Sequence, residues 1–441
     1  MDNEKLDDLK KKGIVSEENG IRVIHADKLE PPVADRSTDD PRKNVGKKNR
    51  KKNRNKNRPK PPPPPEPEQV EDEEPDEEPK ELFPPPADIS KRELLKKKEY
   101  KMSEEDVPKG VGLDVGTSFL VSGRFADDGK IHFQKYRDCF LELTPKSPIN
   151  KKIMYKGLMD RGAPFIEKDG KYYVLGEDAF LMANERHETT RRPMSRGVLS
   201  PSEKEAFPIL KELISRLVGE PTVPNEKLVF SVPAKPIDAD FDQQFHQEMI
   251  RTFINGLGFD AEPMNEAEAL AYSELLEEGL TGIAVSCGAG MMNVAVLSSG
   301  DPVVTFSTSR SGDWVDQQAA TATNLTSSII QQEKEDPDLD LMNPDPSSQI
   351  QQAISIYYGN LLVYTLEQIA YDLQRSPSLP KFKDPIPMVV GGGTSLPRGF
   401  IEKFKQALAA VDMPVEISEV RHAADPLHAV SNGLTLAASM E

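Results

Sequence analysis

The sequence has little cysteine and no long apolar run. Its two cysteines, Cys139 and Cys287, are too few for the disulfide framework of a small secreted domain. No apolar stretch approaches the roughly 18 residues that a membrane-spanning helix requires. The charged start of the chain, residues 1–13, also lacks the apolar segment of a secretory signal. We therefore expect a cytoplasmic protein without a transmembrane segment.

Histidine is scarce, and two common nucleotide-binding motifs are missing. The six histidines show no zinc-ligand spacing with cysteine or carboxylate residues, which argues against a structural zinc site. The pattern GxxxxGK[ST] is absent, and so is GxGxxG at the start of a helix. P-loop and dinucleotide-binding folds are therefore poor candidates.

The composition indicates a folded body joined to a long polar segment. Only 37% of the 441 residues are hydrophobic, prolines outnumber glycines by 38 to 28, and the net charge is −17. Residues 42–60 hold eleven Lys or Arg residues and no acid, and residues 66–81 hold ten acids. Segregated charge of this kind buries little, so we expect residues 1–108 to form a disordered N-terminal tail. Within it, residues 89–106 could form a short charged helix.

The basic block of the tail has two interpretations. Clusters of lysine and arginine attract nucleic acid or an anionic membrane surface, and the five prolines at 61–65 are a stiff spacer that could bind a protein partner. Alternatively, the block is a solvated segment that is partly neutralised by the acidic block. The second interpretation is slightly favoured, because no aromatic residue interleaves the basic run to stack on bases.

From Gly110 onward, β-rich runs alternate with helical patterns, which is typical of an α/β fold with two lobes. A long helix is expected from about 350 to 374, after a loop at 331–348. A four-residue spacing of apolar residues predicts an amphipathic helix over 241–257. Its core face is expected to consist of Phe245, Met249, Phe253 and Leu257.

Three glycine-marked segments stand at the ends of apolar strands. In the first glycine segment, residues 110–125, a strand contains Asp114 and leads into Gly116, Thr117 and Ser118. Glycine lets the backbone approach a phosphate, and the two hydroxyls can donate to its oxygens. Asp114 could hold Mg²⁺ through water. An ordinary hairpin turn is the competing interpretation of this segment taken alone.

The second glycine segment, residues 281–297, repeats this design, whereas the third, residues 387–404, enters a helix. Two similar hairpins 172 residues apart indicate two pseudo-equivalent lobes that grip one ligand from both sides. A glycine turn before a helix N-terminus suits an anion or the flat approach of a nucleoside. The candidate binding residues of these segments are Gly288, Ala289, Gly290, Met291, Gly391, Gly392, Gly393 and Thr394.

Taken in order, the three glycine segments resemble the phosphate-1, phosphate-2 and adenosine motifs of the actin/Hsp70/hexokinase superfamily. Within it, the chain is most similar to bacterial actins of the MreB and MamK type. The resemblance implies a two-lobed actin-like ATPase fold of duplicated ribonuclease-H-like lobes at residues 109–441, with ATP and Mg²⁺ bound between the lobes. Further matches lie at residues 172–180, 191–200, 228–235, 309–317 (with Gly312 beside the nucleotide) and 424–434.

The resemblance also assigns roles to individual acids. Residues 265–272 are similar to the connecting element in which an acid orients the attacking water, and that role falls on Glu266. Asp114 takes the other catalytic role and that of metal ligand. Two alternatives remain: Glu266 is an N-terminal helix acid stabilised by the helix dipole, or Glu262 or Glu268 orients the water.

The chain departs from the family pattern at two places. Ser286 stands where the second phosphate motif usually has Asp, and Met291 and Met292 replace two hydroxyl residues. Fewer charges and donors then surround the phosphates, so we expect a weak ATPase whose hydrolysis is slow or lost. The outer subdomain around 313–350 is short for the family, and the family's Lys/Glu pair at the adenine has no evident counterpart.

Three functions are consistent with these residues. The first is an actin-like cytoskeletal protein that binds ATP and Mg²⁺ and assembles with itself into filaments. The second is a catalytically degenerate scaffold or adaptor that recruits partners through its N-terminal tail. The third, a chaperone-like ATPase, ranks last because no peptide-binding domain accompanies the core.

Overall fold

The computed structural model describes residues 110–440, apart from residues 187, 242 and 378, and one short hairpin near the N-terminus. The hairpin pairs β1 (Val15–Glu18) with β2 (Ile21–Ile24) in antiparallel register. It lies within the range where we expected disorder. The rest of the expected tail, including the helix at 89–106, falls outside the described residues.

Lobe I is built on a five-stranded sheet of order β12-β11-β3-β4-β5. Three strands form an antiparallel meander, and the other two run parallel to the first. Two helices cover one face of the sheet through a shared aliphatic and aromatic core. The elements are β3 (Val111–Val115), β4 (Phe119–Phe125), β5 (Ile131–Arg137), α4 (Ala206–Val218), β11 (Lys227–Val232), α5 (Gln243–Gly256) and β12 (Asp260–Asn265).

Lobe II repeats this plan with a second five-stranded sheet, of order β15-β14-β13-β16-β17. Again a three-stranded antiparallel meander is followed by two strands parallel to its first strand. Its core takes buried residues from four helices. The elements are β13 (Gly282–Cys287), β14 (Met292–Ser298), β15 (Asp301–Thr308), α7 (Gly312–Thr323), α9 (Gln349–Arg375), β16 (Ile386–Gly391), α10 (Phe400–Leu408) and β17 (Ile417–His422).

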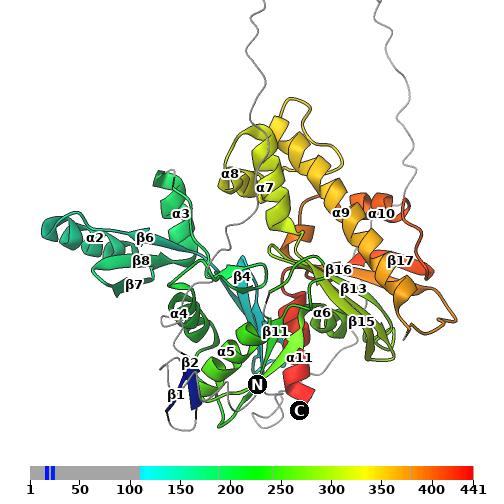
Figure 1. Cartoon of the computed structure of the whole chain (residues 1–441), viewed down its shortest axis with the longest axis horizontal. Helices are drawn as coiled ribbons and strands as arrows, with labels where there is room; N and C mark the ends of the chain where they lie inside the picture. The colour runs from blue at the N-terminus through cyan, green and yellow to red at the C-terminus, as the bar shows by residue number, and fades with distance from the viewer. Residues whose placement is uncertain are drawn as a thin grey trace, which may run out of the picture. The chain divides into compact units, whose positions relative to one another are not determined.

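Helices α6 (Glu266–Glu274) and α11 (Ala429–Met440) lie between the two sheets, as Figure 1 shows. Their contact is close because both helices present small side chains: a Cβ on Gly433 would collide with Ala269 O. The core that surrounds them takes Val229 from lobe I and Ala284 from lobe II. The two lobes are thus joined through a shared layer of helices, and the expected duplicated α/β fold is confirmed.

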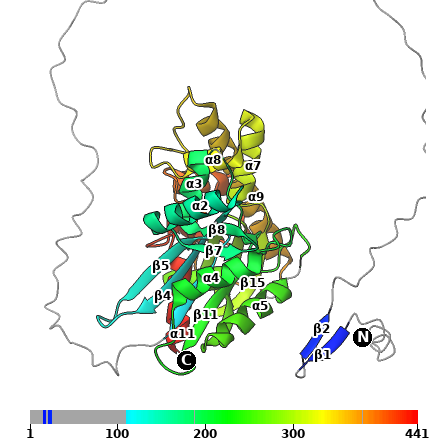
Figure 2. The ribbon, with the colours of Figure 1, turned by 90° about the vertical axis from the view of Figure 1, so that its left-hand side faces the viewer.

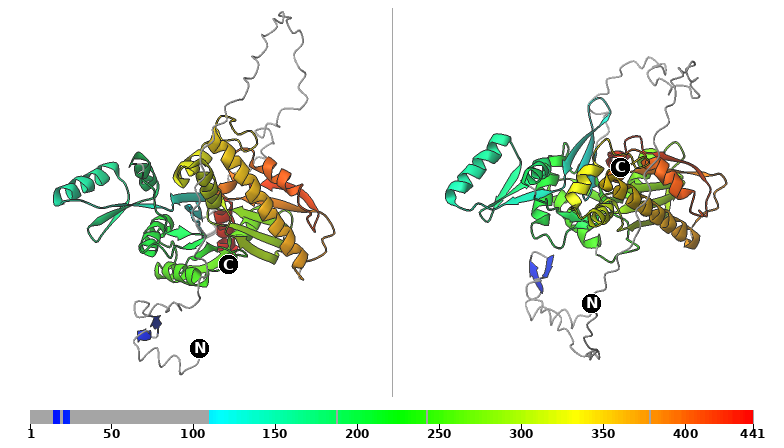
Figure 3. Two further views of the ribbon diagram at one scale, coloured as in Figure 1. Left: turned by 45° about the horizontal axis from the view of Figure 1, so that its top comes forward. Right: turned by 90° about the horizontal axis from the view of Figure 1, so that it is seen from above.

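Each lobe also carries an outer part. In lobe I it is a three-stranded antiparallel sheet with two helices, which Figures 1 and 3 show projecting from the inner sheet. In lobe II it consists of α7, α8 (Ser327–Lys334) and the turns before α9. The outer elements of lobe I are β6 (Phe140–Leu143), α2 (Pro148–Arg161), β7 (Phe165–Lys168), β8 (Lys171–Leu175) and α3 (Gly176–Arg186), followed by the short pair β9 (Met194–Ser195) and β10 (Val198–Leu199).

Two details of the predicted helices need correction. Helix α5 exists, but its buried face is His246, Ile250 and Ile254, and Phe245 is 59% exposed. Both sets have four-residue spacing, so periodicity alone could not choose between them. The segment expected to be a loop from residue 331 begins instead as the last turn of α8.

The long helix expected at about 350–374 is confirmed as α9. Its start is fixed by the hydroxyl of Ser348, which accepts a hydrogen bond from Gln351 N at 3.2 Å. In the part of the chain that the structure describes, no helix has the length and apolarity needed to cross a bilayer.

Candidate functional site

The three glycine segments meet around one cavity of about 560 Å³ between the two lobes. Two of the expected residues stand just behind its wall: Gly391 ends β16 against Leu270, and Gly312 begins α7 beside Thr394. The other expected residues line the cavity: Asp114, Gly116, Thr117, Ser118, Glu266, Gly288, Ala289, Gly290, Met291, Gly392, Gly393 and Thr394.

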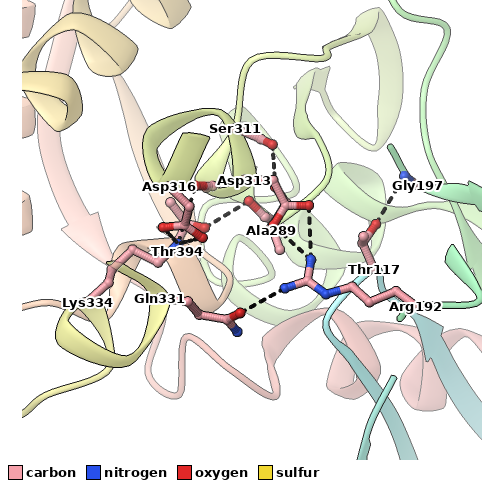
Figure 4. Close-up of polar contacts among 12 residues, drawn as sticks. Thr117, Arg192, Gly197, Ala289, Ser311, Asp313, Asp316, Gln331, Lys334 and Thr394 are labelled. Atoms are coloured by element: carbon pink, nitrogen blue, oxygen red, sulfur yellow. Dashed lines mark hydrogen bonds and ion pairs between the residues drawn. The ribbon is translucent and has the colours of Figure 1, made fainter. Parts of the chain in front are cut away.

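The turn of the first glycine segment forms the lobe I side of the cavity. A Cβ on Gly116 would stand 2.6 Å from the carbonyl oxygen of Phe119, so this position requires glycine. Thr117 Oγ1 accepts a hydrogen bond from Gly197 N at 3.0 Å (Figure 4). Ser118 Oγ, in contrast, is buried at the cavity wall without a hydrogen-bond partner. Burying an unpaired hydroxyl is unfavourable, and an anionic oxygen in the cavity would give it an acceptor.

The turn of the second glycine segment is tied to its neighbours in lobe II (Figure 4). Thr394 Oγ1 donates to Gly288 O at 2.8 Å, and Asp313 N donates to Ala289 O at 2.8 Å. Ser311 Oγ donates to the same carbonyl of Ala289. These bonds join the second glycine segment, the start of α7 and the third glycine segment into one wall.

The two hairpin turns touch each other across the cavity. A Cβ on Gly290 would collide with Thr117 Oγ1 and stand 2.9 Å from Gly197 N. Only a residue without a side chain permits this approach. The contact sets how near the two lobes come at the floor of the cavity.

Two acids share that floor. Asp114 Oδ1 accepts a hydrogen bond from Ser231 Oγ at 2.8 Å, and Glu266 Oε2 accepts one from Asn293 Nδ2 at 2.8 Å. Burial raises the pKa of Asp114 to about 6. Burial and, secondly, the charge of Asp114 raise the pKa of Glu266 to about 8, against the hydrogen bonds from Asn293 and Ser286. At neutral pH, Glu266 is therefore mostly protonated.

Of the three acids considered for orienting water, only Glu266 lines the cavity in the described part of the chain. Glu262 is exposed and pairs with Lys227 at 2.7 Å. Glu266 is also the first residue of α6, whose N-cap Asn265 accepts hydrogen bonds from Ala267 N and Glu268 N. Its position thus fits both the water-orienting interpretation and the helix-dipole interpretation.

The acid pair suits a hydrated divalent cation. No group of three or more His, Cys, Asp or Glu residues that could hold a metal gathers in the described residues. Mg²⁺, however, commonly takes only one or two carboxylates and keeps much of its water. Asp114 and Glu266 repel each other when both are ionised, and a cation between them would relieve this repulsion.

The far end of the cavity contains residues that the sequence did not indicate. The side chains of Gln331, Lys334 and Glu335 line its wall, at and just after the end of α8. Lys334 Nζ lies 2.8 Å from Asp316 Oδ1, and it donates to Gly312 O at 3.3 Å. Lys334 and Glu335 therefore both line the cavity, each paired with a different residue. The sequence did not indicate either residue because the segment was interpreted as a loop.

Two arginines of lobe I reach acids of lobe II across the mouth of the cavity. Arg137, at the end of β5, donates to Glu335 Oε2 at 3.0 Å and to Oε1 at 3.2 Å. Its guanidinium also lies against the rings of Phe119 and Phe180, and it pairs with Glu177 in its own lobe. The second arginine, Arg192, donates hydrogen bonds to the carboxylate of Asp313 and to Gln331 Oε1 (Figure 4). We call this set, Arg137, Arg192, Asp313, Gln331 and Glu335, the cross-cleft clasp.

Solved structures resemble this architecture. The MamK double helical filament shares 20% sequence identity at a TM-score of 0.54, covering 75% of this chain and 98% of that chain. MreB5 of Spiroplasma citri bound to ADP shares 17% identity at a TM-score of 0.50, covering 74% of this chain and 95% of that chain. A comparison with curated proteins gives no match.

The structural likenesses establish the fold: two duplicated α/β lobes, as in MamK and MreB5. The family match is independent of the structure and covers the whole core. The volactin family matches residues 110–438, and this chain, whose fold is similar to those of MamK and MreB5, belongs to that family.

Proposed function

We propose that this protein is a cytoplasmic, actin-like cytoskeletal protein that binds ATP with Mg²⁺ between its lobes and assembles into filaments. The observation that carries the proposal is the meeting of three glycine turns from two lobes around one cavity, with Gly290 in contact with Thr117. An anion gripped at this point contacts both lobes at once. Its presence therefore favours one lobe arrangement over others.

The wall of the cavity offers the phosphates several contacts. Ser118 Oγ is a buried donor without a partner, and the glycine turns let backbone N–H groups approach an anion. Asp114 would hold Mg²⁺, which supplies charge compensation to the phosphate tail. Gly312 and the third glycine segment, Gly391–Thr394, would lie on the nucleoside side. Lys334, which also lines the cavity, donates a hydrogen bond to Gly312 O at 3.3 Å.

Hydrolysis is expected to be slow. Without Mg²⁺, a pKa of about 8 keeps Glu266 mostly protonated at neutral pH, and in that state it can orient a water by a hydrogen bond. Asn293 fixes that orientation: its Nδ2 donates to Glu266, and its Oδ1 accepts from Ala234 N at 2.9 Å. Ser286 brings no charge where the family usually has an acid. Phosphate release from Mg·ATP should therefore be weak.

Filament assembly is supported by the likeness to the MamK double helical filament and by apolar surface on the outer part of lobe I. Ile149 and Ile153 of α2 are 73% and 65% exposed, and Met159 is 56% exposed. Exposed apolar side chains grouped on one element are typical of protein contact surfaces. Head-to-tail addition of identical subunits does not close, and so produces a filament.

The test is sedimentation of the purified full chain with Mg·ATP, Mg·ADP, a non-hydrolysable ATP analogue and no nucleotide. We expect pelleting that rises with protein concentration in Mg·ATP, and filaments in electron micrographs of the pellet. Pelleting at background under every nucleotide condition would remove the filament proposal. Calorimetric titration with Mg·ATP tests nucleotide binding separately.

A second candidate is a scaffold that keeps the fold and lacks turnover, recruiting partners through its N-terminal tail. The specific observation in its favour is that Ser286, Met291 and Met292 replace the polar residues expected in the second glycine segment. This candidate predicts that pelleting is independent of nucleotide or absent, and that deletion of residues 1–108 abolishes partner capture. Nucleotide-dependent polymer formed by the core alone would contradict it.

A further inference from the structure

Four cationic side chains line the cavity in the described part of the chain, and they are not equivalent. Three are held by carboxylates within 4 Å. Lys135 has no carboxylate within that distance, and its ammonium lies 5.5 Å from the centroid of the Phe119 ring. The three ion-paired cations are Arg137 (Glu177 and Glu335), Lys334 (Asp316) and Arg398 (Asp340).

The strand register places Lys135, an exposed residue that lines the cavity, on the same face of the lobe I sheet as Asp114. Asp114 of β3 is opposite Val121 of β4, and Val121 is opposite Lys135 of β5. Residues that are directly opposite in antiparallel strands share a face, so these three side chains form one row. Adjacent strands lie about 4.8 Å apart. Lys135 and Asp114 are thus about 10 Å apart at the backbone, and a lysine side chain can span most of that distance.

The surroundings of Lys135 confirm which way it faces. Figure 2 shows β4 and β5 side by side as a hairpin of the lobe I sheet. The next residue, Tyr136, packs on the opposite face, against the core under α4. The ammonium of Lys135 lies over the ring of Phe119. Phe119 directly follows Ser118, whose hydroxyl lacks a hydrogen-bond partner. The unpaired cation and the unpaired donor therefore border the same part of the cavity.

We propose that Lys135 is the cation that binds the phosphate tail of a nucleoside triphosphate in this cleft. The inference deepens the proposed function and rests on it. A triphosphate requires charge compensation, and the methionines of the second glycine segment supply none. A cation over an exposed aromatic ring gains only about 0.5–1 kcal/mol. The lysine can therefore leave Phe119 for a phosphate oxygen at little cost.

Arg137 does not fit this role, although it is two residues away on the same face. Its guanidinium is bonded to two acids and lies against two rings, and its side chain is only 9% exposed. Binding a phosphate would require it to abandon Glu335 and so to open the clasp. Lys135 can bind an anion without breaking any ion pair.

The test compares Lys135→Met with wild type in calorimetric titrations of the full chain against Mg·ATP and adenosine. Methionine keeps an unbranched apolar side chain of similar length beside Phe119 and removes the positive charge. Because hydrogen bonds to charged groups contribute about 1.5–3 kcal/mol, we expect Mg·ATP affinity to fall about 10- to 100-fold. Adenosine affinity should stay within about twofold, since only the phosphate contact is lost.

Two further variants complete the design. Lys135→Arg should retain Mg·ATP affinity within a fewfold. Lys130→Met removes a solvent-exposed lysine of the same hairpin, 80% exposed and outside the cavity lining, and should change nothing. Equal Mg·ATP affinity in wild type and Lys135→Met would overturn the inference, and so would parallel loss of ATP and adenosine binding. Absence of nucleotide binding by the wild type itself would instead mean that the proposed function has failed.

Discussion

Replacing Glu266 by glutamine should stabilise the nucleotide-free protein, and more so as the pH rises. Glu266 is 8% exposed and close enough to Asp114 for that charge to raise its pKa. Glutamine is nearly isosteric, and its amide oxygen can still accept the hydrogen bond from Asn293. The substitution therefore removes a buried titratable group while it keeps the packing.

The magnitude follows from the pKa. The folded value, about 8, lies above the ordinary value of 4.5, so the proton stabilises the fold fully below pH 4.5, and this stabilisation is lost as the pH rises through about 8. The interval from pH 5.5 to 8 spans about 2.5 pH units, and each unit changes the free energy of unfolding of the wild type by about 1.4 kcal/mol, or about 3.5 kcal/mol in all. About half of the molecules still hold the proton at pH 8, which reduces the loss to about 3 kcal/mol. For a core of about 330 residues, this corresponds to about 4 °C in the melting midpoint.

The assay is thermal melting of wild type and Glu266→Gln without nucleotide or Mg²⁺, at pH 5.5, 7 and 8.5. The midpoint difference, variant minus wild type, should grow by about 4 °C across this range. Glu277→Gln changes an exposed acid just beyond α6 and should show no such trend. A difference that stays constant or shrinks with pH would show that Glu266 is not a buried acid that holds its proton.

Three further outcomes are expected. Glu335→Gln should weaken lobe closure by about 1 kcal/mol and increase the radius of gyration measured by small-angle X-ray scattering. Glu177→Gln should not, because both acids pair with Arg137 but only Glu335 belongs to the other lobe. An equal radius of gyration in both variants would contradict the clasp. Gly290→Ala should reduce Mg·ATP affinity at least 10-fold, because the added Cβ would collide with Thr117 Oγ1. In the control Gly157→Ala, the added Cβ points into open space on α2. This control should bind Mg·ATP normally, and its free energy of unfolding should rise by about 0.5–1 kcal/mol. Mg²⁺ affinity should rise about 100-fold between pH 6 and 8 if both cavity carboxyls bind the cation, because protons compete for each of them. Titrations that show no pH dependence would refute that competition.

The parts of the site that the sequence revealed are those whose chemistry is local. A glycine after an apolar strand indicates a turn at which backbone can approach a ligand, and this applies to Gly116, Gly290 and Gly392 alike. Their convergence could be predicted because strands that end in turns at one sheet edge face a common space. Asp114 was found through its place beside the first of these turns, whereas Glu266 was found only through the resemblance of residues 265–272 to the family's connecting element.

The remaining parts depend on contacts between residues far apart in the chain. Arg137 and Glu335 are separated by 198 residues, and nothing near either residue marks it as an ion-pair partner. The helix that ends at Lys334 is short and polar, so its apolar periodicity is too weak to distinguish it from a loop. In α5, two apolar sets have the same spacing, and only packing on the sheet selects Ile250 and Ile254 as the buried set.

The ion pairs of the clasp all run in one direction between the lobes. Lobe I supplies the cations Arg137 and Arg192, and lobe II supplies the acids Glu335 and Asp313 that hold them. If the arginines of the clasp also bound the phosphates, a nucleotide would compete with the acids of lobe II and drive the lobes apart. With Lys135 as the phosphate cation, the clasp and the nucleotide are compatible, and both hold the lobes together. Bound triphosphate then adds to a closure that the chain already maintains through its own ion pairs.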